Sequence, residues 1–119
     1  MTAMRLISYP AHGAVEMLVG FAVMVAPVAL GLSAAAAVAG IVLGVVLVGL
    51  SLSSTDSGHT GRNGMTLAAH HAFDHGLVLG MLGTAAVLGA AGDKVAALVF
   101  AIAAAAQLAL NLTTRYSHR

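Results

Sequence analysis

Four long stretches of this sequence are almost free of charged side chains. They run from about Pro10 to Leu30, from Ala34 to Leu52, from Met65 to Ala90 and from Lys94 to Thr114. A helix needs about 20 apolar residues to cross the ~30 Å hydrocarbon core of a bilayer. Only 8% of the residues are charged, against about 25% in soluble domains. The chain is therefore predicted to lie in a membrane and to cross it four times.

Helices are favoured over strands in all four stretches. Alanine-rich runs such as "AIAAAAQLALNL" have high helix propensity, and the alternating polarity of a membrane β-barrel is absent from the sequence. Residues 53–64, "SSTDSGHTGRNG", are predicted to form a polar loop, and "AAGDK" a tight turn. We expect an all-α fold, an integral membrane four-helix bundle that forms a single domain over residues 1–119.

The basic residues predict how the chain is oriented. Arg5, Arg62, Arg115 and Arg119 would all lie on one side of the membrane, whereas the other side has only Lys94. Loops rich in Lys and Arg stay in the cytoplasm. The protein is therefore predicted to be a multi-pass protein of the cell (inner) membrane, with both termini in the cytoplasm.

Composition excludes several classes of function. The chain has no cysteine, which rules out disulfides and thiolate metal sites. A net charge of +1 leaves no basic surface for nucleic acid. We find no nucleophile with its base and no phosphate-binding loop, so the sequence argues against a self-sufficient hydrolase or kinase and leans away from an enzyme; an enzyme that acts on a lipid or quinone through a metal stays open. Tyr9 and Tyr116 are predicted to anchor the chain at the membrane–water interface.

The two halves of the chain resemble each other at an offset of 58 residues. "AHGAVE" at residues 11–16 aligns with "AHHAFD" at residues 69–74, which pairs histidine with histidine and glutamate with aspartate. We interpret this as two tandem two-helix hairpins, residues 10–52 and 65–114, related by a pseudo-twofold axis along the membrane normal. Without a gap, the same offset also pairs Leu30 and Gly31 with Leu88 and Gly89, Leu50 with Leu108, and Leu52 with Leu110.

Residues 20–31, "GFAVMVAPVALG", resemble the repeat of the SPW-repeat family of small bacterial membrane proteins. That repeat is a Gly-led helix that reaches Ser-Pro-Trp and then Leu/Phe-Gly. Here Ala26 and Val28 flank Pro27 in place of the Ser and the Trp, and the second copy has Ala85 where the proline would be. The resemblance implies a membrane hairpin and no particular chemistry.

Two His–carboxylate pairs are the candidate functional residues of the sequence. Residues four apart share a helix face, so His12 stacks with Glu16 and His70 with Asp74. Each carboxylate lies 15 residues, or about 22 Å, before the predicted far-side turn. Ionisable residues at such depth normally face the bundle interior and mark a functional site. Nitrogen and oxygen donors of this kind suit Zn, Fe, Mn or Cu, so a transition-metal site is the leading hypothesis.

Other polar residues could extend this site. His71 and His75 lie about 100° around the same helix from the first pair and are possible extra ligands. Gln107 and Asn111 are four residues apart in the last span and would reach a similar depth, where they could orient the ligands. His59 and His118 are predicted to lie in solvent.

Three alternatives to a metal ion remain open. His12 and His70 could bind one b-type haem from both sides as a bis-histidine redox centre. The acid–imidazole pairs could relay protons or cations in a small transporter. They could also tie the helices together in a cofactor-free accessory or scaffold subunit.

Glycine patterns predict close helix packing. Gly40 with Gly44, and Gly76 with Gly80, form G-x-x-x-G motifs, which let membrane helices approach each other. They concern assembly within the bundle or between copies, so we expect a homo-oligomer or a larger membrane complex.

Overall fold

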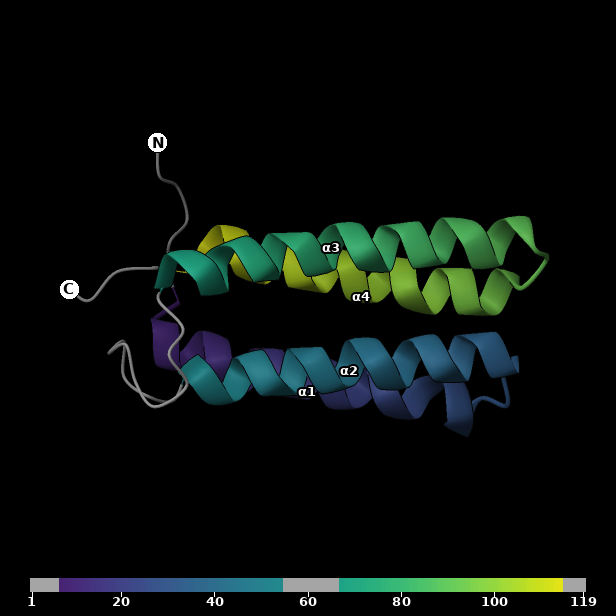
Figure 1. The fold of residues 1–119 in the computed structure, drawn as a ribbon, viewed down its shortest axis with the longest axis horizontal. Helices are drawn as coiled ribbons and strands as arrows, with labels where there is room; N and C mark the ends of the chain where they lie inside the picture. Colours follow the sequence, from purple (N-terminus) through teal and green to yellow (C-terminus); the bar gives the residue numbers. More distant parts are fainter. Residues whose placement is uncertain (1–6, 55–66, 115–119) are drawn as a thin grey trace.

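Four helices make up the part of the chain that the structure describes (Figure 1). The computed structural model describes residues 7–54 and 67–114. The helices are α1 (Tyr9–Ala29), α2 (Ala34–Ser54), α3 (Leu67–Ala90) and α4 (Lys94–Thr113). All four are long and apolar enough to cross a membrane. The predicted all-α membrane bundle is therefore confirmed.

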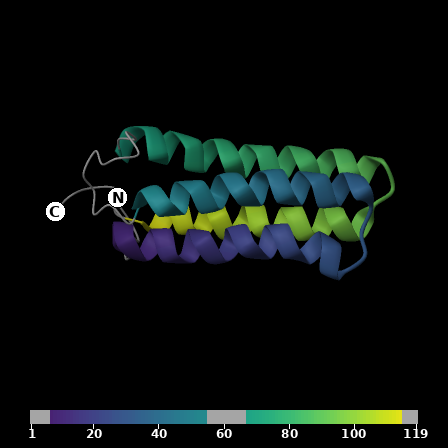
Figure 2. The same ribbon diagram turned by 60° about the horizontal axis from the view of Figure 1, so that its bottom comes forward.

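The bundle consists of two antiparallel hairpins, α1–α2 and α3–α4, whose turns lie at the same end (Figures 1 and 2). The hairpins meet where α1 packs against α4 and α2 against α3. At the opposite end of the bundle, a backbone bridge joins the residue before α1 to the residue after α4. Ile7 N–H donates to the carbonyl of Thr113 at 2.9 Å, and Ile7 pairs with Thr114 in parallel. This bridge fixes the start of α1 beside the end of α4.

The helix ends differ from the predicted ones by a few residues. α1 begins at Tyr9, where the Ser8 side chain caps the helix and Pro10 occupies the first turn, a position that suits proline. α2 continues to Ser54, so the first two residues of the predicted polar loop are helical. Serine has only moderate helix propensity, but it does not end a helix that has already formed. The rest of that loop, residues 55–64, lies outside the described residues.

Glycine and cap residues form the two turns. Gly31 and Gly92 have φ of 67° and 97°, a backbone region that favours glycine because it has no Cβ. Ser33 caps α2 and also donates from Oγ to Asp93 Oδ2 at 2.7 Å, and Asp93 caps α4. The hydrogen bond from Ser33, followed by the one from the backbone N–H of Ala96, lowers the pKa of the exposed Asp93 carboxyl. The two hairpins are thus linked at their turns.

Burial along the second helices corrects the ungapped alignment of the two halves. α1 and α3 match at the predicted offset of 58, since His12, Glu16 and Val23 are buried like His70, Asp74 and Met81. α2 and α4 match at an offset of 60 instead. Leu50 and Leu110 are both buried, whereas Leu108, the partner of Leu50 at an offset of 58, is 39% exposed. The shift of two residues arises because α3 runs three residues further than the counterpart of α1, while the turn that follows it, residues 91–93, is one residue shorter than the turn at residues 30–33. Descent of the two hairpins from one ancestor stays a prediction.

Glycines bring α1 and α2 close together. A Cβ placed on Gly40 would lie 2.5 Å from the carbonyl oxygen of Val23, and one on Gly44 would lie 2.6 Å from that of Gly20. Gly76 and Gly80 on α3 behave differently. A Cβ on Gly76 would meet nothing within 4 Å, and one on Gly80 only a leucine methyl at 3.9 Å. Among the described residues, close approach therefore involves the first G-x-x-x-G motif and not the second.

We expect Gly40→Ala to destabilise the protein by about 1–3 kcal/mol, because the new methyl group would overlap backbone atoms of α1 and push the helices apart. Gly76→Ala is the matched control. It adds the same methyl group to open space and should be neutral or slightly stabilising, since Ala is the better helix former by about 0.5–1 kcal/mol. Unfolding of both variants in mixed detergent micelles measures the difference. Equal stability of the two variants would contradict the close approach.

Candidate metal centre

α1 and α3 bring the four predicted ligand residues into one cluster. His12, Glu16, His70 and Asp74 are each 0% exposed, and one ligand atom from each lies within 4.8 Å of all the others. The helical period explains this arrangement, because residues four apart point to the same side of a helix and both pairs point to the other hairpin. We call these four residues the His–carboxylate cluster.

The shortest contacts in the cluster run between the helices rather than along them. His12 Nε2 lies 2.9 Å from Asp74 Oδ2, and His70 Nε2 lies 3.1 Å from Glu16 Oε1. The pairs within one helix are longer, at 3.5 Å for His12–Glu16 and 3.3 Å for His70–Asp74. One oxygen of each carboxylate, Glu16 Oε1 or Asp74 Oδ2, therefore touches both imidazoles, and two nitrogens and two oxygens alternate around a ring of four contacts.

These spacings match a mononuclear metal site. Metal–ligand bonds of about 2.0–2.2 Å place neighbouring donor atoms about 3.3–3.6 Å apart in a tetrahedral site and about 2.8–3.1 Å apart in a square one. The four nitrogen–oxygen distances in the cluster, 2.9 to 3.5 Å, are those of hydrogen bonds and ion pairs, and they also fall within these two ranges taken together. The cluster could therefore hold a metal ion without a large change in the backbone.

A threonine hydroxyl orients the first imidazole. Thr114 Oγ1 donates its only proton to the carbonyl of Leu110 at 2.6 Å, and it lies 2.8 Å from His12 Nδ1. The threonine oxygen must therefore accept a hydrogen bond from Nδ1–H. His12 Nε2 then faces the carboxylates with a lone pair that can bind a metal or, in a doubly protonated ring, with a proton that they accept. Hydrogen bonds of this kind fix metal-binding histidines in many sites.

A tyrosine plays the corresponding part for the second imidazole. The Tyr9 hydroxyl lies 2.8 Å from His70 Nδ1, and Tyr9 is only 6% exposed. Its predicted role as an anchor at the membrane surface is therefore wrong. Tyr9 is turned inward because it occupies the first turn of α1, next to the start of α3. Tyr116, predicted as the second anchor, lies outside the described residues.

Two amides on α4 complete the cluster on one side. Gln107 Nε2 donates to Glu16 Oε2 at 3.0 Å and to Asn111 Oδ1 at 2.9 Å. Both amide residues are at most 1% exposed. Gln107 thus contacts the cluster through the glutamate oxygen that does not touch the histidines, and Asn111 accepts a hydrogen bond from Gln107. At the matching positions of α2 stand Leu47 and Ser51, so this support is present on one side only.

Positive charge near the cluster is scarce. Lys94, the only lysine or arginine among residues 7–54 and 67–114, begins α4 at the turn end of the bundle, whereas Gln107 lies beside the cluster three and a half turns later. Two carboxylates buried in a membrane need a compensating charge. Within the described part of the chain, the carboxyl groups are either protonated themselves or balanced by protonated imidazoles or a bound cation.

His71 and His75 stand apart from the cluster. Their rings contact each other, with centroids 4.6 Å apart, and neither belongs to the group of ligand atoms that lie within 4.8 Å of one another. Of the three histidines of α3, His70 is therefore buried in the cluster, whereas His71 and His75 form a half-buried pair. His59 and His118 lie outside the described residues, as do Arg5, Arg62, Arg115 and Arg119.

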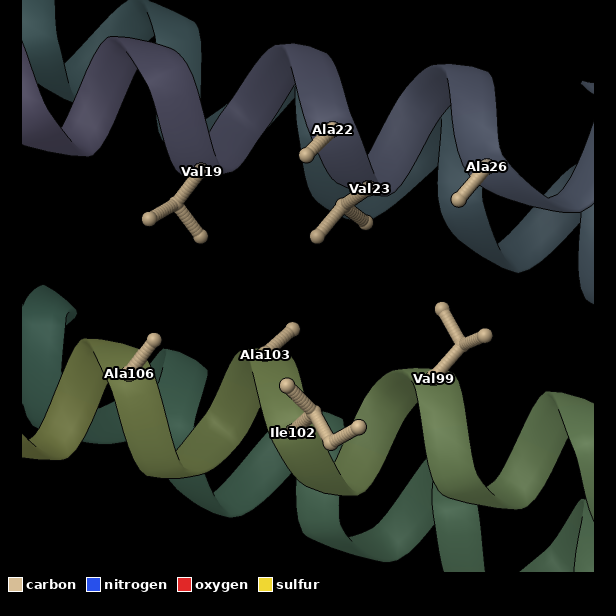
Figure 3. Close-up of a pocket in the computed structure, with 8 residues that line it drawn as sticks. All are labelled: Val19, Ala22, Val23, Ala26, Val99, Ile102, Ala103 and Ala106. Atoms are coloured by element: carbon tan, nitrogen blue, oxygen red, sulfur yellow. The ribbon is translucent and has the colours of Figure 1, made fainter.

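An apolar pocket of about 270 Å³ lies between α1 and α4, and Figure 3 shows its aliphatic side chains facing each other across the two helices. It approaches the cluster, since Val19 is one turn after Glu16 and Ala106 adjoins Gln107. It is lined by Val19, Ala22, Val23, Ala26, Val99, Ile102, Ala103 and Ala106. The pocket offers no polar group that could bind an ion.

The cluster does not fit a bis-histidine haem. In such a centre the macrocycle lies between the two imidazoles. Here oxygens of Glu16 and Asp74 lie within 3.5 Å of both Nε2 atoms and occupy that space. The donor set of two nitrogens and two oxygens suits a single metal ion instead.

Comparison of the chain with models of protein families, with curated proteins and with solved structures finds no match. Its function must therefore be argued from the geometry of the His–carboxylate cluster.

Proposed function

We propose that this protein binds one divalent transition-metal ion inside the membrane, at the His–carboxylate cluster. The observation that carries the proposal is the alternating ring of two imidazole nitrogens and two carboxylate oxygens, fully buried and spaced at 2.9–3.5 Å. The hydroxyls of Tyr9 and Thr114 support it, because each holds an imidazole by Nδ1 with Nε2 turned into the ring.

Charge balance favours a divalent ion. Two carboxylates and two neutral imidazoles carry a charge of –2, which a divalent cation neutralises, and a neutral site is the one that a membrane interior tolerates. Donors of this type suit Zn, Fe, Mn or Cu. In the divalent series the affinity of a protein site generally rises towards copper. Competition among these ions at fixed concentration therefore ranks their affinities for this site.

The membrane and the orientation of the protein are part of the proposal. Arginines flank the end of the bundle at which α1 begins and α4 ends, and the turn end has only Lys94. The positive-inside rule then supports an inner-membrane protein with both termini, and the metal site, on the cytoplasmic side. The resemblance to SPW-repeat proteins and the homo-oligomer or larger complex stay predictions.

The test is metal analysis of the full-length protein purified in detergent. The protein is dialysed against Zn²⁺, Fe²⁺, Mn²⁺ or Cu²⁺ in turn, and bound metal is quantified by mass spectrometry. We expect about one tightly held ion per chain, as a four-ligand site predicts. A stable, folded protein that stays free of metal in all four dialyses would overturn the proposal and favour the cofactor-free subunit or the transporter.

Thr114→Val should weaken metal binding about 10–100-fold, because it removes the hydrogen-bond acceptor that orients His12 while keeping the size of the side chain. Thr113→Val is the matched control. The Thr113 hydroxyl donates only to backbone carbonyls of α4, those of Ala109 and Leu110. Competition with a chromophoric chelator measures both affinities. The same affinity in the two variants would show that Thr114 does not act through His12.

A further inference from the structure

The His71–His75 pair on α3 is not used by the cluster. The two residues are four apart on one helix, their ring centroids lie 4.6 Å apart, and the planes of the rings are inclined by 56°. Two histidines at this spacing on one helix face are the arrangement with which helical His-x-x-x-His motifs bind zinc. Their side chains therefore already converge as a chelating pair would.

The pair lies at the edge of the contact between α3 and α4, because Leu82 on the same face of α3 is 45% exposed. Gly89 lies 18 residues, or five helical turns, beyond His71 and so shares its face of α3. A Cβ on Gly89 would lie 3.2 Å from Ala97 Cβ on α4, so this face is turned towards α4. Both His71 and His75 are half-buried there, unlike the fully buried His70 next to them.

The depth of the pair also suits access from water. His71 and His75 lie about 6 and 12 Å along α3 from its start at Leu67, near the boundary of the hydrocarbon core. In α1, the positions 58 residues earlier hold Gly13 and Met17. The packing of a helix at this place in the bundle therefore does not require two histidines, and the pair is a feature of α3 alone.

We propose that His71 and His75 bind a second divalent transition-metal ion, with one ring nitrogen from each residue and water in the remaining positions. Two protein ligands hold an ion less tightly than four, so this site is the weaker of the two. It shares no ligand with the cluster, and it stands whether or not the cluster itself binds metal.

The experiment is equilibrium dialysis of the full-length protein in detergent against increasing Zn²⁺, with bound zinc counted by mass spectrometry. We expect the wild type to bind about two ions per chain in a tight and a weak class, in keeping with one four-ligand and one two-ligand site. His71→Ala combined with His75→Ala should lose only the weak class. His59→Ala combined with His118→Ala, which removes two histidines outside the described residues, should keep it.

Other outcomes separate the two proposals. Glu16→Gln combined with Asp74→Asn should lose only the tight class. If the wild type shows the weak class alone and the His71/His75 variant loses it, the proposed function fails and this inference stands. If the weak class survives in a His71/His75 variant that keeps its helical circular dichroism and elution volume, or is absent from the wild type, this inference is wrong.

Discussion

Glu16→Gln is expected to lower the affinity of the protein for Zn²⁺ by more than about 100-fold, since even the loss of a group that only orients a metal ligand costs about 10–100-fold. The substitution keeps the size of the side chain and its ability to accept the hydrogen bond from Gln107, which now reaches Glu16 Oε2 at 3.0 Å. It removes the negative charge and one of the two anionic oxygens of the ring. Zinc competition with a chelator, in detergent at constant pH, measures the loss.

Asp93→Asn is the matched control for this experiment. It also neutralises a carboxylate, but Asp93 is an exposed cap residue in the turn between α3 and α4, at the end of the bundle away from the cluster. Its zinc affinity should equal that of the wild type. If Glu16→Gln binds zinc as tightly as Asp93→Asn does, Glu16 is not a ligand and the proposed site fails.

Helical period and hydropathy were sufficient to predict the bundle and the members of the cluster. An i,i+4 spacing places His12 with Glu16 and His70 with Asp74 whatever the surroundings, and the cost of a buried carboxylate turns both pairs inwards. The crossed contacts, with His12 closer to Asp74 than to Glu16, depend on how α1 and α3 are rotated about their axes. That rotation is set by packing between helices far apart in sequence, so a local pattern could not predict it.

The groups that hold the imidazoles were missed for a related reason. Tyr9 lies in the first turn of α1 and Thr114 directly after α4, at opposite ends of the chain. In the sequence, both residues stand at the end of a predicted membrane span, where contact with the membrane surface is expected. The bridge between Ile7 and Thr114 brings these ends together. A small signal was present, since a threonine directly after a membrane helix and a tyrosine in the first turn of another can each reach a neighbouring helix with a hydroxyl.

The wrong offset between α2 and α4 also has a physical origin. A repeat offset is constant only while no residue is inserted, and turns are where insertions cost least. Three additional residues at the end of α3 and one fewer in the turn after it shift Leu110, rather than Leu108, to the position of Leu50. The aligned histidines and carboxylates precede the turn, so the prediction of the cluster was not affected.

His12→Leu is expected to destabilise the protein by about 3–5 kcal/mol, the cost of leaving a buried charge without its partner. His12 is the closest imidazole to Asp74, at 2.9 Å, and the variant leaves two buried carboxylates with one imidazole. The free energy of unfolding in mixed micelles, in the presence of a chelator, measures this cost without a contribution from bound metal.

Replacing the whole cluster separates stability from function. A variant in which all four cluster residues and Gln107 become apolar residues of similar volume should be as stable as the chelator-treated wild type, or more stable by about 1–4 kcal/mol, because apolar packing often replaces buried ion pairs without loss. It should bind no metal at the tight site. Such a result would mean that the chain keeps four costly residues in its membrane interior for what they bind. If the apolar variant is instead less stable than His12→Leu, the role of the cluster is to hold α1 and α3 together. A cofactor-free subunit is then the better description of the protein.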